Sequence, residues 1–198
     1  MIESQGLAHF ERLYQQDSDP WRLQQRWYER RKRALVLACL TQPRYQLAYE
    51  PGCGNGFMTV SLAQRCDKLI SSDGAPTAVR LTKARILQED PQPDVVVEQH
   101  FLPRDWPSQK FDLILLNEIA YYFSPSSLDE LRMKAVESLV TGGMLMLCHC
   151  RAPFADRAQS TAAVHDNFHS DAGLYSLLRY EEEEFLIEAW SNIASPCA

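Results

Sequence analysis

The chain has 198 residues, of which 45% are hydrophobic and 23% are charged, and its formal net charge is −6. This length and composition are typical of one globular domain with its own core. They exclude a membrane span, which needs about 18 consecutive apolar residues. The negative charge argues against general nucleic-acid binding. The first ten residues lack the pattern of a secretory signal, so we expect a cytoplasmic protein.

The predicted elements alternate between helices and strands. Helices over 7–14 and 21–40 come first, with Asp19 as the N-cap and Pro20 in the first turn of the second helix. The next elements are strand 45–49, helix 57–65, strand 69–72, helix 75–87, strand 95–98, strand 111–116, helix 127–139 and strand 144–148. The strands 174–180 and 185–190 end the chain.

This alternation predicts an α/β fold with a mostly parallel sheet, right-handed crossovers and helices on both faces. The run 111–116, which is apolar apart from Asp112, indicates a strand buried on both sides. The short link between the last two strands allows only an antiparallel C-terminal hairpin.

The cysteines and histidines form no recognisable metal-binding pattern. The cysteines at positions 39, 53, 66, 148, 150 and 197 contain no C-x-x-C pair, and we interpret them as free thiols. In Cys148-His149-Cys150, the two thiols would point to one face of a strand and the imidazole to the other. His165 and His169 could share a helix face, and we expect that pair to be solvated. The sequence therefore predicts no metal site.

The stretch from Glu50 to Gly56 stands between a predicted strand and a predicted helix and contains three glycines. Its glycine spacing is one residue shorter than the G-x-G-x-x-G of a dinucleotide site, and an acid precedes it. This suits a ligand that carries an amino-acid ammonium group in place of phosphates. The pattern resembles motif I of the Rossmann-like S-adenosylmethionine-dependent methyltransferases, and that resemblance implies a seven-stranded sheet and S-adenosyl-L-methionine as cofactor.

Ligands of open α/β sheets bind beyond the carboxyl ends of the strands, at the topological switch point. There we expect Glu50, with Gly52, Cys53 and Gly54, to meet the cofactor, because glycine lets a ligand approach the backbone. Asp73 ends the second strand and is placed to accept hydrogen bonds from the ribose hydroxyls.

Two further strand ends supply predicted site residues. The third strand has no carboxylate where many of these methyltransferases bind adenine, so His100 or Gln99 and the backbone near Phe101 are the predicted contacts. The fourth strand ends in Asn117, a predicted cofactor contact, and Glu118, with Tyr121 close behind.

Two blocks of sequence resemble the nodulation protein S family. They are Asp19-Pro20-Trp21 with Arg26-Trp27-Tyr28-Glu29 and Arg31-Lys32-Arg33-Ala34-Leu35, and the stretch Asn117-Glu118-Ile119-Ala120-Tyr121-Tyr122. The resemblance runs from about Phe10 to Cys150. Members of that family methylate an amino group of a chitooligosaccharide, so the resemblance implies an N-methyltransferase with a small-molecule acceptor.

The resemblance also implies that the N-terminal helix lies over the cofactor as part of a lid. Tyr28 would then cover the methionine portion, and Arg31 would pair with its carboxylate. Trp27 lies on the apolar face of the predicted helix, so we interpret it as a core residue.

For the chemistry, Glu118 and Tyr121 are the predicted catalytic residues. Glu118 would orient or take the proton of the acceptor amine, or would equally hold the cofactor ammonium. Tyr121 and Tyr122 would form walls of the acceptor pocket. We expect one domain over 1–198, with a lid at 1–42, a cofactor-binding core at 43–150 and an acceptor-side segment at 151–198. A non-catalytic S-adenosylmethionine-binding protein, an NAD-dependent oxidoreductase and a nucleic-acid methyltransferase remain alternatives.

Overall fold

The computed structural model describes residues 4–90 and 94–194. Seven strands form one mixed sheet in the order β3-β2-β1-β4-β5-β7-β6. The strands are β1 (Tyr45–Pro51), β2 (Cys66–Asp73), β3 (Asp94–Gln99), β4 (Phe111–Asn117), β5 (Leu139–Cys150), β6 (Tyr175–Glu181) and β7 (Phe185–Ser191). The helices are α1 (Ser4–Gln16), α2 (Trp27–Ala38), α3 (Phe57–Ala63), α4 (Pro76–Glu89), α5 (Pro125–Glu137), α6 (Thr161–His169) and the 3-10 helix η1 (Ala120–Tyr122). This mostly parallel sheet with an antiparallel C-terminal pair confirms the predicted fold.

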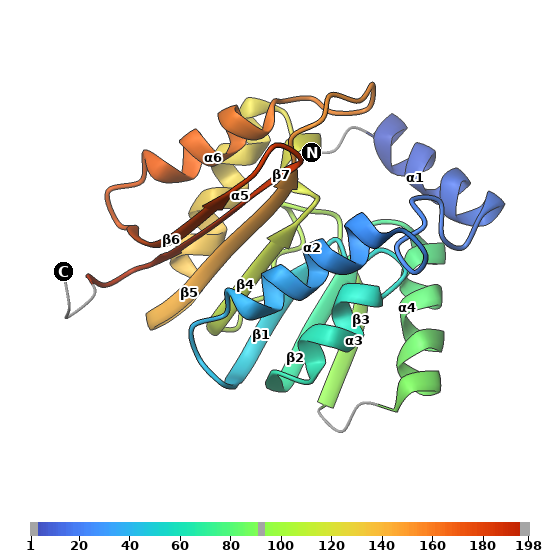
Figure 1. Ribbon diagram of the computed structural model, residues 1–198, viewed down its shortest axis with the longest axis horizontal. Helices are drawn as coiled ribbons and strands as arrows, with labels where there is room; N and C mark the ends of the chain where they lie inside the picture. The colour runs from blue at the N-terminus through green and yellow to red at the C-terminus, as the bar shows by residue number, and fades with distance from the viewer. Residues whose placement is uncertain (1–3, 91–93, 195–198) are drawn as a thin grey trace. The chain divides into compact units, whose positions relative to one another are not determined.

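The chain forms two compact units, Glu3–Phe101 and Leu102–Ala198. In the first, β1 pairs with β2 and β2 with β3, all parallel. Helix α4 packs on β2 and β3, and α1 lies against α4 (Figure 1). Because Pro51 is in register with Ser72, the carboxyl ends of β1 and β2 lie side by side.

The second helix begins later than the sequence predicts, at Trp27 and not at residue 21. Arg22 has a φ of 59°, which breaks the helical path. The Asp19 carboxylate accepts from the backbone N–H of Leu23 at 2.8 Å, so this residue caps a turn and not α2. The interpretation of Trp27 as a core residue is wrong, because 69% of its surface is exposed.

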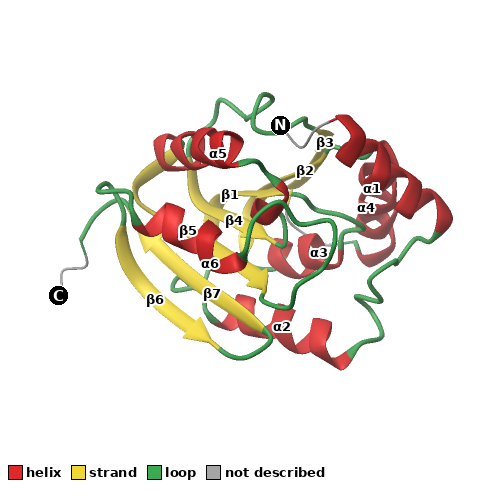
Figure 2. Ribbon diagram, turned by 90° about the horizontal axis from the view of Figure 1, so that it is seen from above, coloured by secondary structure: helices red, strands yellow, loops and turns green. Residues whose placement is uncertain are grey.

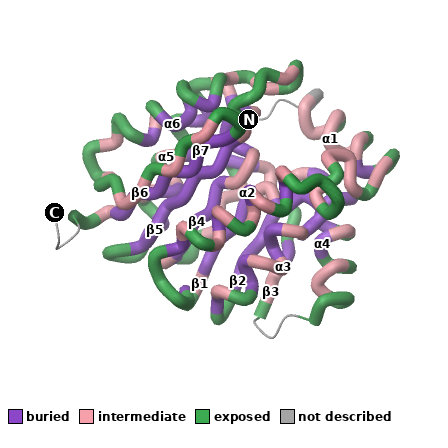
Figure 3. The backbone as a smooth tube through the Cα atoms, in the orientation of Figure 1, coloured by how far each residue is buried: buried purple, intermediate pink, exposed green. Residues whose placement is uncertain are grey.

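The second unit is built around β4, β5 and β7, whose central residues are buried (Figure 3). β4 and β5 are parallel, whereas β5–β7 and β7–β6 are antiparallel. Helices α5 and α6 pack against each other and against β5 (Figure 2). Their side chains therefore cover one face of this part of the sheet.

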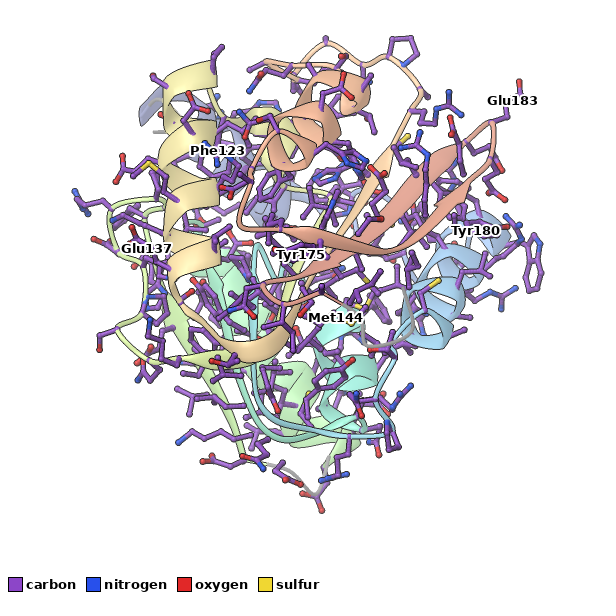
Figure 4. All side chains as sticks on the ribbon, turned by 90° about the vertical axis from the view of Figure 1, so that its left-hand side faces the viewer. Phe123, Glu137, Met144, Tyr175, Tyr180 and Glu183 are labelled. Carbon is purple, nitrogen blue, oxygen red and sulfur yellow. The ribbon has the colours of Figure 1, made fainter. Side chains whose placement is uncertain are left out.

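Helix α5 begins at Pro125, two residues before the predicted start. The hydroxyl of Ser124 accepts from the N–H of Ser127 at 3.3 Å, so Ser124 is the N-cap, and Pro125 occupies the first helical position. Figure 4 shows Phe123 near the first turn of this helix and Glu137 near its last turn.

The hairpin β6–β7 places Tyr175 and Tyr180 towards the two ends of its outer strand, with Glu183 at the turn (Figure 4). Among residues 4–90 and 94–194 the cysteines are free thiols, and Cys197 lies outside the described residues. No helix in the same ranges combines the length and apolarity that crossing a membrane requires.

Candidate functional site

The glycine turn after β1 has the backbone conformation that its sequence requires. Gly52, Gly54 and Gly56 have φ values of 76°, 59° and 84°, which residues with a Cβ rarely adopt. The N–H groups of Gly52 and Cys53 both donate to the carbonyl of Ser72, at 2.7 and 2.9 Å. The turn is therefore fixed to the end of β2 and leads directly into α3.

Asp73 lies beside this turn at the end of β2. One carboxylate oxygen accepts from the N–H of Gly54 at 3.0 Å, and the other accepts from the N–H of Ala75 at 2.9 Å. Burial raises the pKa of Asp73, while these backbone bonds act in the opposite direction. A carboxylate has about four acceptor sites, so the group can accept a ligand hydroxyl in addition to its backbone bonds.

Glu50 is buried beneath the turn, with 1% of its surface exposed. Ser71 Oγ donates to Glu50 Oε2 at 2.8 Å. Burial, together with the negative charge of Asp73, raises the pKa of Glu50 to about 7, although its side-chain hydrogen bonds act in the opposite direction. A ligand ammonium nearby would favour the ionised carboxylate, so this environment fits the predicted role of Glu50.

His100 follows β3 directly, and its hydrogen bonds join it to other residues of the first unit. Its Nδ1 lies 3.3 Å from the Tyr49 hydroxyl, and its Nε2 lies 3.2 Å from Glu98. The backbone N–H of His100 donates to the backbone carbonyl of Asp73 at 3.1 Å, so the backbone of residues 100 and 101 is held near the end of β2. Adenine contact by His100 and Phe101 stays a prediction.

Tyr14 is a neighbour of the glycine turn that the sequence analysis did not identify. A Cβ added at Gly54 would lie 2.6 Å from the Tyr14 hydroxyl. The Tyr14 ring packs edge-on against Trp21, with centroids 5.5 Å apart, and against Ala75 and Ala78. No local pattern signals this contact, because it joins residues forty positions apart in different elements.

Asn55 provides a second link between the turn and the N-terminal segment. The side chain is fully buried, and its Nδ2 donates to the carbonyl of Ser18 at 2.9 Å and to Asp19 at 3.2 Å. Together with Tyr14, Asn55 fixes the segment between α1 and α2 to the glycine turn.

The predicted lid residues Tyr28 and Arg31 both belong to α2. The ammonium of Lys32 lies 4.6 Å from the centroid of the Tyr28 ring and 3.0 Å from Glu29, in a buried cluster. These contacts lie within α2 and link three of its side chains. Cofactor contact by Tyr28 and Arg31 stays a prediction.

Glu118 lies just beyond β4, in the second unit. Its φ is 57°, an uncommon value for a residue other than glycine. Its N–H donates to the carbonyl of Cys148 at 2.8 Å, and its Oε2 accepts from the N–H of Cys150 at 3.1 Å. The same Oε2 accepts from the Tyr121 hydroxyl. The structure therefore brings the two predicted catalytic residues together.

Tyr121 is buried, and burial together with the charge of Glu118 raises its pKa well above the usual range. The phenol therefore stays protonated and serves as a donor to Glu118. The neighbouring residue Asn117 has a buried Oδ1 that accepts no hydrogen bond within the described residues. A buried acceptor of this kind fits a ligand that brings a donor.

Aromatic side chains surround Tyr121, and one of them, Phe154, was not predicted from the sequence. The Phe154 ring lies 5.1 Å from Tyr121 and 5.9 Å from Tyr122, centroid to centroid. The Arg157 guanidinium lies 5.7 Å from the Tyr121 centroid and 5.4 Å from that of Phe154. The N–H of Ala158 donates to the carbonyl of Tyr121 at 2.8 Å, which holds this loop against η1.

The histidine predictions need correction. His165 is 1% exposed and is not solvated, although it shares α6 with the partly exposed His169. His149 belongs to β5 and is completely buried. Within the described part of the chain, no group of three histidine, cysteine or acidic side chains is placed to hold a metal ion.

The comparisons with known proteins agree on one family. The family model described as "Nodulation protein S (NodS)" matches residues 8–151. Nodulation protein S of Rhizobium tropici is 33% identical over 138 residues, which are 67% of this chain and 56% of that protein. The Sinorhizobium fredii protein of the same name is 32% identical over 106 residues, which are 52% of this chain and 47% of that protein. The chain thus spans about half the length of the curated relatives it matches.

Solved structures show the same fold. A candidate methyltransferase from Pseudomonas syringae is 38% identical, with a TM-score of 0.73, over 84% of this chain and 99% of that one. The N-methyltransferase NodS of Bradyrhizobium japonicum, solved with S-adenosyl-L-homocysteine, is 21% identical, with a TM-score of 0.82, over 94% and 97% of the two chains. The resemblance noted from the sequence is confirmed, and the chain belongs to the nodulation protein S family.

Proposed function

We propose that this protein is an S-adenosyl-L-methionine-dependent methyltransferase that methylates an amine of a small-molecule acceptor. The observation that carries the proposal is the glycine turn bound to Ser72, with Asp73 beside it. The Asp73 carboxylate can accept a ligand hydroxyl in addition to its backbone bonds. The family to which the chain belongs supports the same activity.

The residues present fit the cofactor. Asp73 would accept the ribose hydroxyls, Gly52, Cys53 and Gly54 would meet the cofactor through their backbone, and Glu50 would balance its ammonium. Asn117 has a buried acceptor that a cofactor donor would satisfy. The further assignments are those made from the sequence, namely His100 and Phe101 at adenine and Tyr28 and Arg31 at the methionine end.

The cofactor supplies a methyl group already activated by the positive sulfur. The protein then has to hold the acceptor nitrogen in line with that methyl group. Glu118 Oε2 is engaged by Tyr121 and by the N–H of Cys150, which fixes the carboxylate that would orient the amine or take its proton. Tyr121, Tyr122 and Phe154 offer flat faces for a sugar or another ring.

The division into a lid at 1–42, a core at 43–150 and an acceptor-side segment at 151–198 is part of this proposal. The contacts of Tyr14 and Asn55 with the glycine turn support a covering role for the N-terminal part. A cytoplasmic location agrees with the free thiols of the described residues. The net charge of −6 favours a small acceptor over a nucleic acid.

Calorimetry with S-adenosylhomocysteine and NAD, followed by a transfer assay with a radiolabelled methyl donor, tests the proposal. We expect binding of the first ligand alone and label transfer to at least one amine in a panel of amino sugars and small amines. Binding of NAD alone would support the oxidoreductase alternative. Cofactor binding without transfer to any amine would support the non-catalytic alternative.

A further inference from the structure

Three buried side chains of the second unit form a continuous hydrogen-bonded chain. His149 Nδ1 lies 3.1 Å from His165 Nε2, and His165 Nδ1 lies 2.6 Å from Glu188 Oε2. No more than 1% of the surface of any of them is exposed. They come from β5, α6 and β7, so the tertiary fold alone brings them together.

At its inner end, this hydrogen-bonded chain contacts the backbone of η1. The N–H of Ala120 donates to His149 Nε2 at 3.1 Å, so that nitrogen carries no proton. His149 must then be protonated at Nδ1 and donate to His165 Nε2. His165 in turn must be protonated at Nδ1 and donate to Glu188. One backbone donor thus determines the tautomer of both imidazoles.

Glu188 closes the chain as an ionised acceptor. Its Oε1 accepts from Arg179 at 2.6 Å and from His169 at 2.8 Å, while Oε2 serves His165. Although burial opposes ionisation, these bonds lower the pKa of Glu188 to about 2. A fixed negative charge therefore holds the far end of the chain at neutral pH.

The element held by this chain carries the predicted catalytic residue Tyr121. The Tyr121 ring lies edge-on to the His149 ring, with centroids 5.0 Å apart. Its hydroxyl reaches Glu118 from the same short helix whose first N–H is bound by His149. The position of the phenol therefore depends on the imidazole beneath it.

We propose that His149 is a positioning residue for methyl transfer. His165 and Glu188 keep the Nε2 of His149 unprotonated, so that it accepts the backbone N–H of η1. The inference rests on the proposed methyltransferase function. The hydrogen-bonded chain carries no proton to the methyl acceptor, because its inner end is a backbone amide. Its contribution is to hold Tyr121, and through it Glu118, in one arrangement.

Adding one proton to His165 would reverse the direction of hydrogen-bond donation between His165 and His149. If His165 were protonated at Nε2, it would face the Nδ1–H of His149, and two donors would meet. Moving the His149 proton to Nε2 would relieve that contact but would set it against the N–H of Ala120. The charged and titratable groups that face His165 are His149 on β5 and Glu188 on β7, with Arg179 on β6 and His169 on α6 behind the carboxylate. Protonation of the chain should therefore displace η1.

The first experiment reads the tautomers directly, by ¹⁵N NMR of the histidine rings in the full chain. We expect His149 and His165 both to carry their proton on Nδ1 at neutral pH. A proton on Nε2 of either ring overturns the inference, whatever the enzyme activity.

The second experiment compares the variants Glu188→Gln and His149→Phe with His169→Gln as the matched control. Glutamine can turn its amide NH₂ towards His165 and so no longer fixes the tautomer, and phenylalanine leaves the Ala120 N–H without an acceptor. We expect kcat/KM for the acceptor to fall by about tenfold or more, since small displacements of reacting groups have large effects on rate. The His169→Gln control removes a bond that reaches the Glu188 carboxylate from outside the hydrogen-bonded chain, so this variant should keep its activity.

Affinity for S-adenosylhomocysteine and the thermal unfolding midpoint show whether each variant is folded. Folded variants with reduced kcat/KM, unchanged cofactor affinity and an acid limb of the pH profile that differs from that of the wild type support the inference. Folded Glu188→Gln and His149→Phe proteins with kcat/KM within twofold of the wild type overturn it. A wild-type protein that binds the cofactor and methylates no amine refutes the proposed function itself.

Discussion

Replacing Gly54 with alanine tests the contact between the glycine turn and the N-terminal segment. Gly54 has a φ of 59°, which costs an alanine about 1–2 kcal/mol. The new Cβ would also lie 2.6 Å from the Tyr14 hydroxyl, closer than any normal contact. We expect this overlap to add about 1 kcal/mol, at the low end for overpacking, because the Tyr14 side chain can shift.

Tyr14→Phe separates the two contributions. Without the hydroxyl, the nearest atom of residue 14 to the new Cβ is Cζ at 3.7 Å, an ordinary contact. In the Tyr14→Phe background, Gly54→Ala should therefore cost only the backbone strain. The predicted coupling between the two substitutions is about 1 kcal/mol.

Urea unfolding of the four proteins in this cycle measures the coupling, with Gly142→Ala as the control. Gly142 has a φ of 78° within β5, and a Cβ there would lie 3.2 Å from Ile193, so it carries similar strain with no link to Tyr14. Only Gly54→Ala should also weaken the binding of S-adenosylhomocysteine. A coupling below about 0.3 kcal/mol, the scatter expected of independent sites, would refute the contact.

Three further predictions concern Asp73, Glu118 and the pH dependence of the free energy of unfolding. Asp73→Ala should weaken the binding of S-adenosylhomocysteine by about 1–3 kcal/mol in calorimetry, while Asp67→Ala, an exposed change on the same strand, should not; equal affinities would remove Asp73 from the site. Glu118→Gln should lower kcat for the acceptor by about 10²-fold or more with little change in cofactor affinity, and an unchanged kcat in single-turnover assays would exclude Glu118 as a catalytic residue. The free energy of unfolding should fall as the pH drops below 6.5, because burial lowers the pKa of His165 and the unfolded chain then binds the proton more strongly. It should fall further between pH 4.5 and about 2, because Glu188 titrates at about 2 in the folded protein against an ordinary 4.5, a contribution of about 3 kcal/mol; a Glu188→Gln protein with the same acid unfolding curve would contradict this.

The sequence was sufficient for the fold because burial determines its strands. Residues 113–116 are all apolar and all completely buried in β4, so the pattern and the environment carry the same information. The helix predicted from residue 21 was wrong for a local reason. The positive φ of Arg22 and the turn around Asp19 depend on contacts with Asn55, which no local pattern contains.

The site could be predicted only where it is encoded locally. The glycine turn and Glu118 follow strands directly, so their positions could be inferred from the strand ends. The chain from His149 to Glu188 joins three elements, and its members look like isolated polar residues in the sequence. Tyr14 was missed for the same reason, since its role depends on where α1 packs.

The outer strand β6 has a consequence for how the protein behaves when concentrated. Among the described residues it is the last strand of the sheet, so within that part of the chain one row of its backbone groups has no neighbouring strand. Its Arg179 and Glu181 side chains bond each other at 2.7 Å and keep charge along this border. Exposed borders recruit strands from other molecules, and charge placed there opposes fibre growth. We therefore expect Arg179, which also bonds the buried Glu188 at 2.6 Å, to oppose edge-to-edge association of concentrated protein.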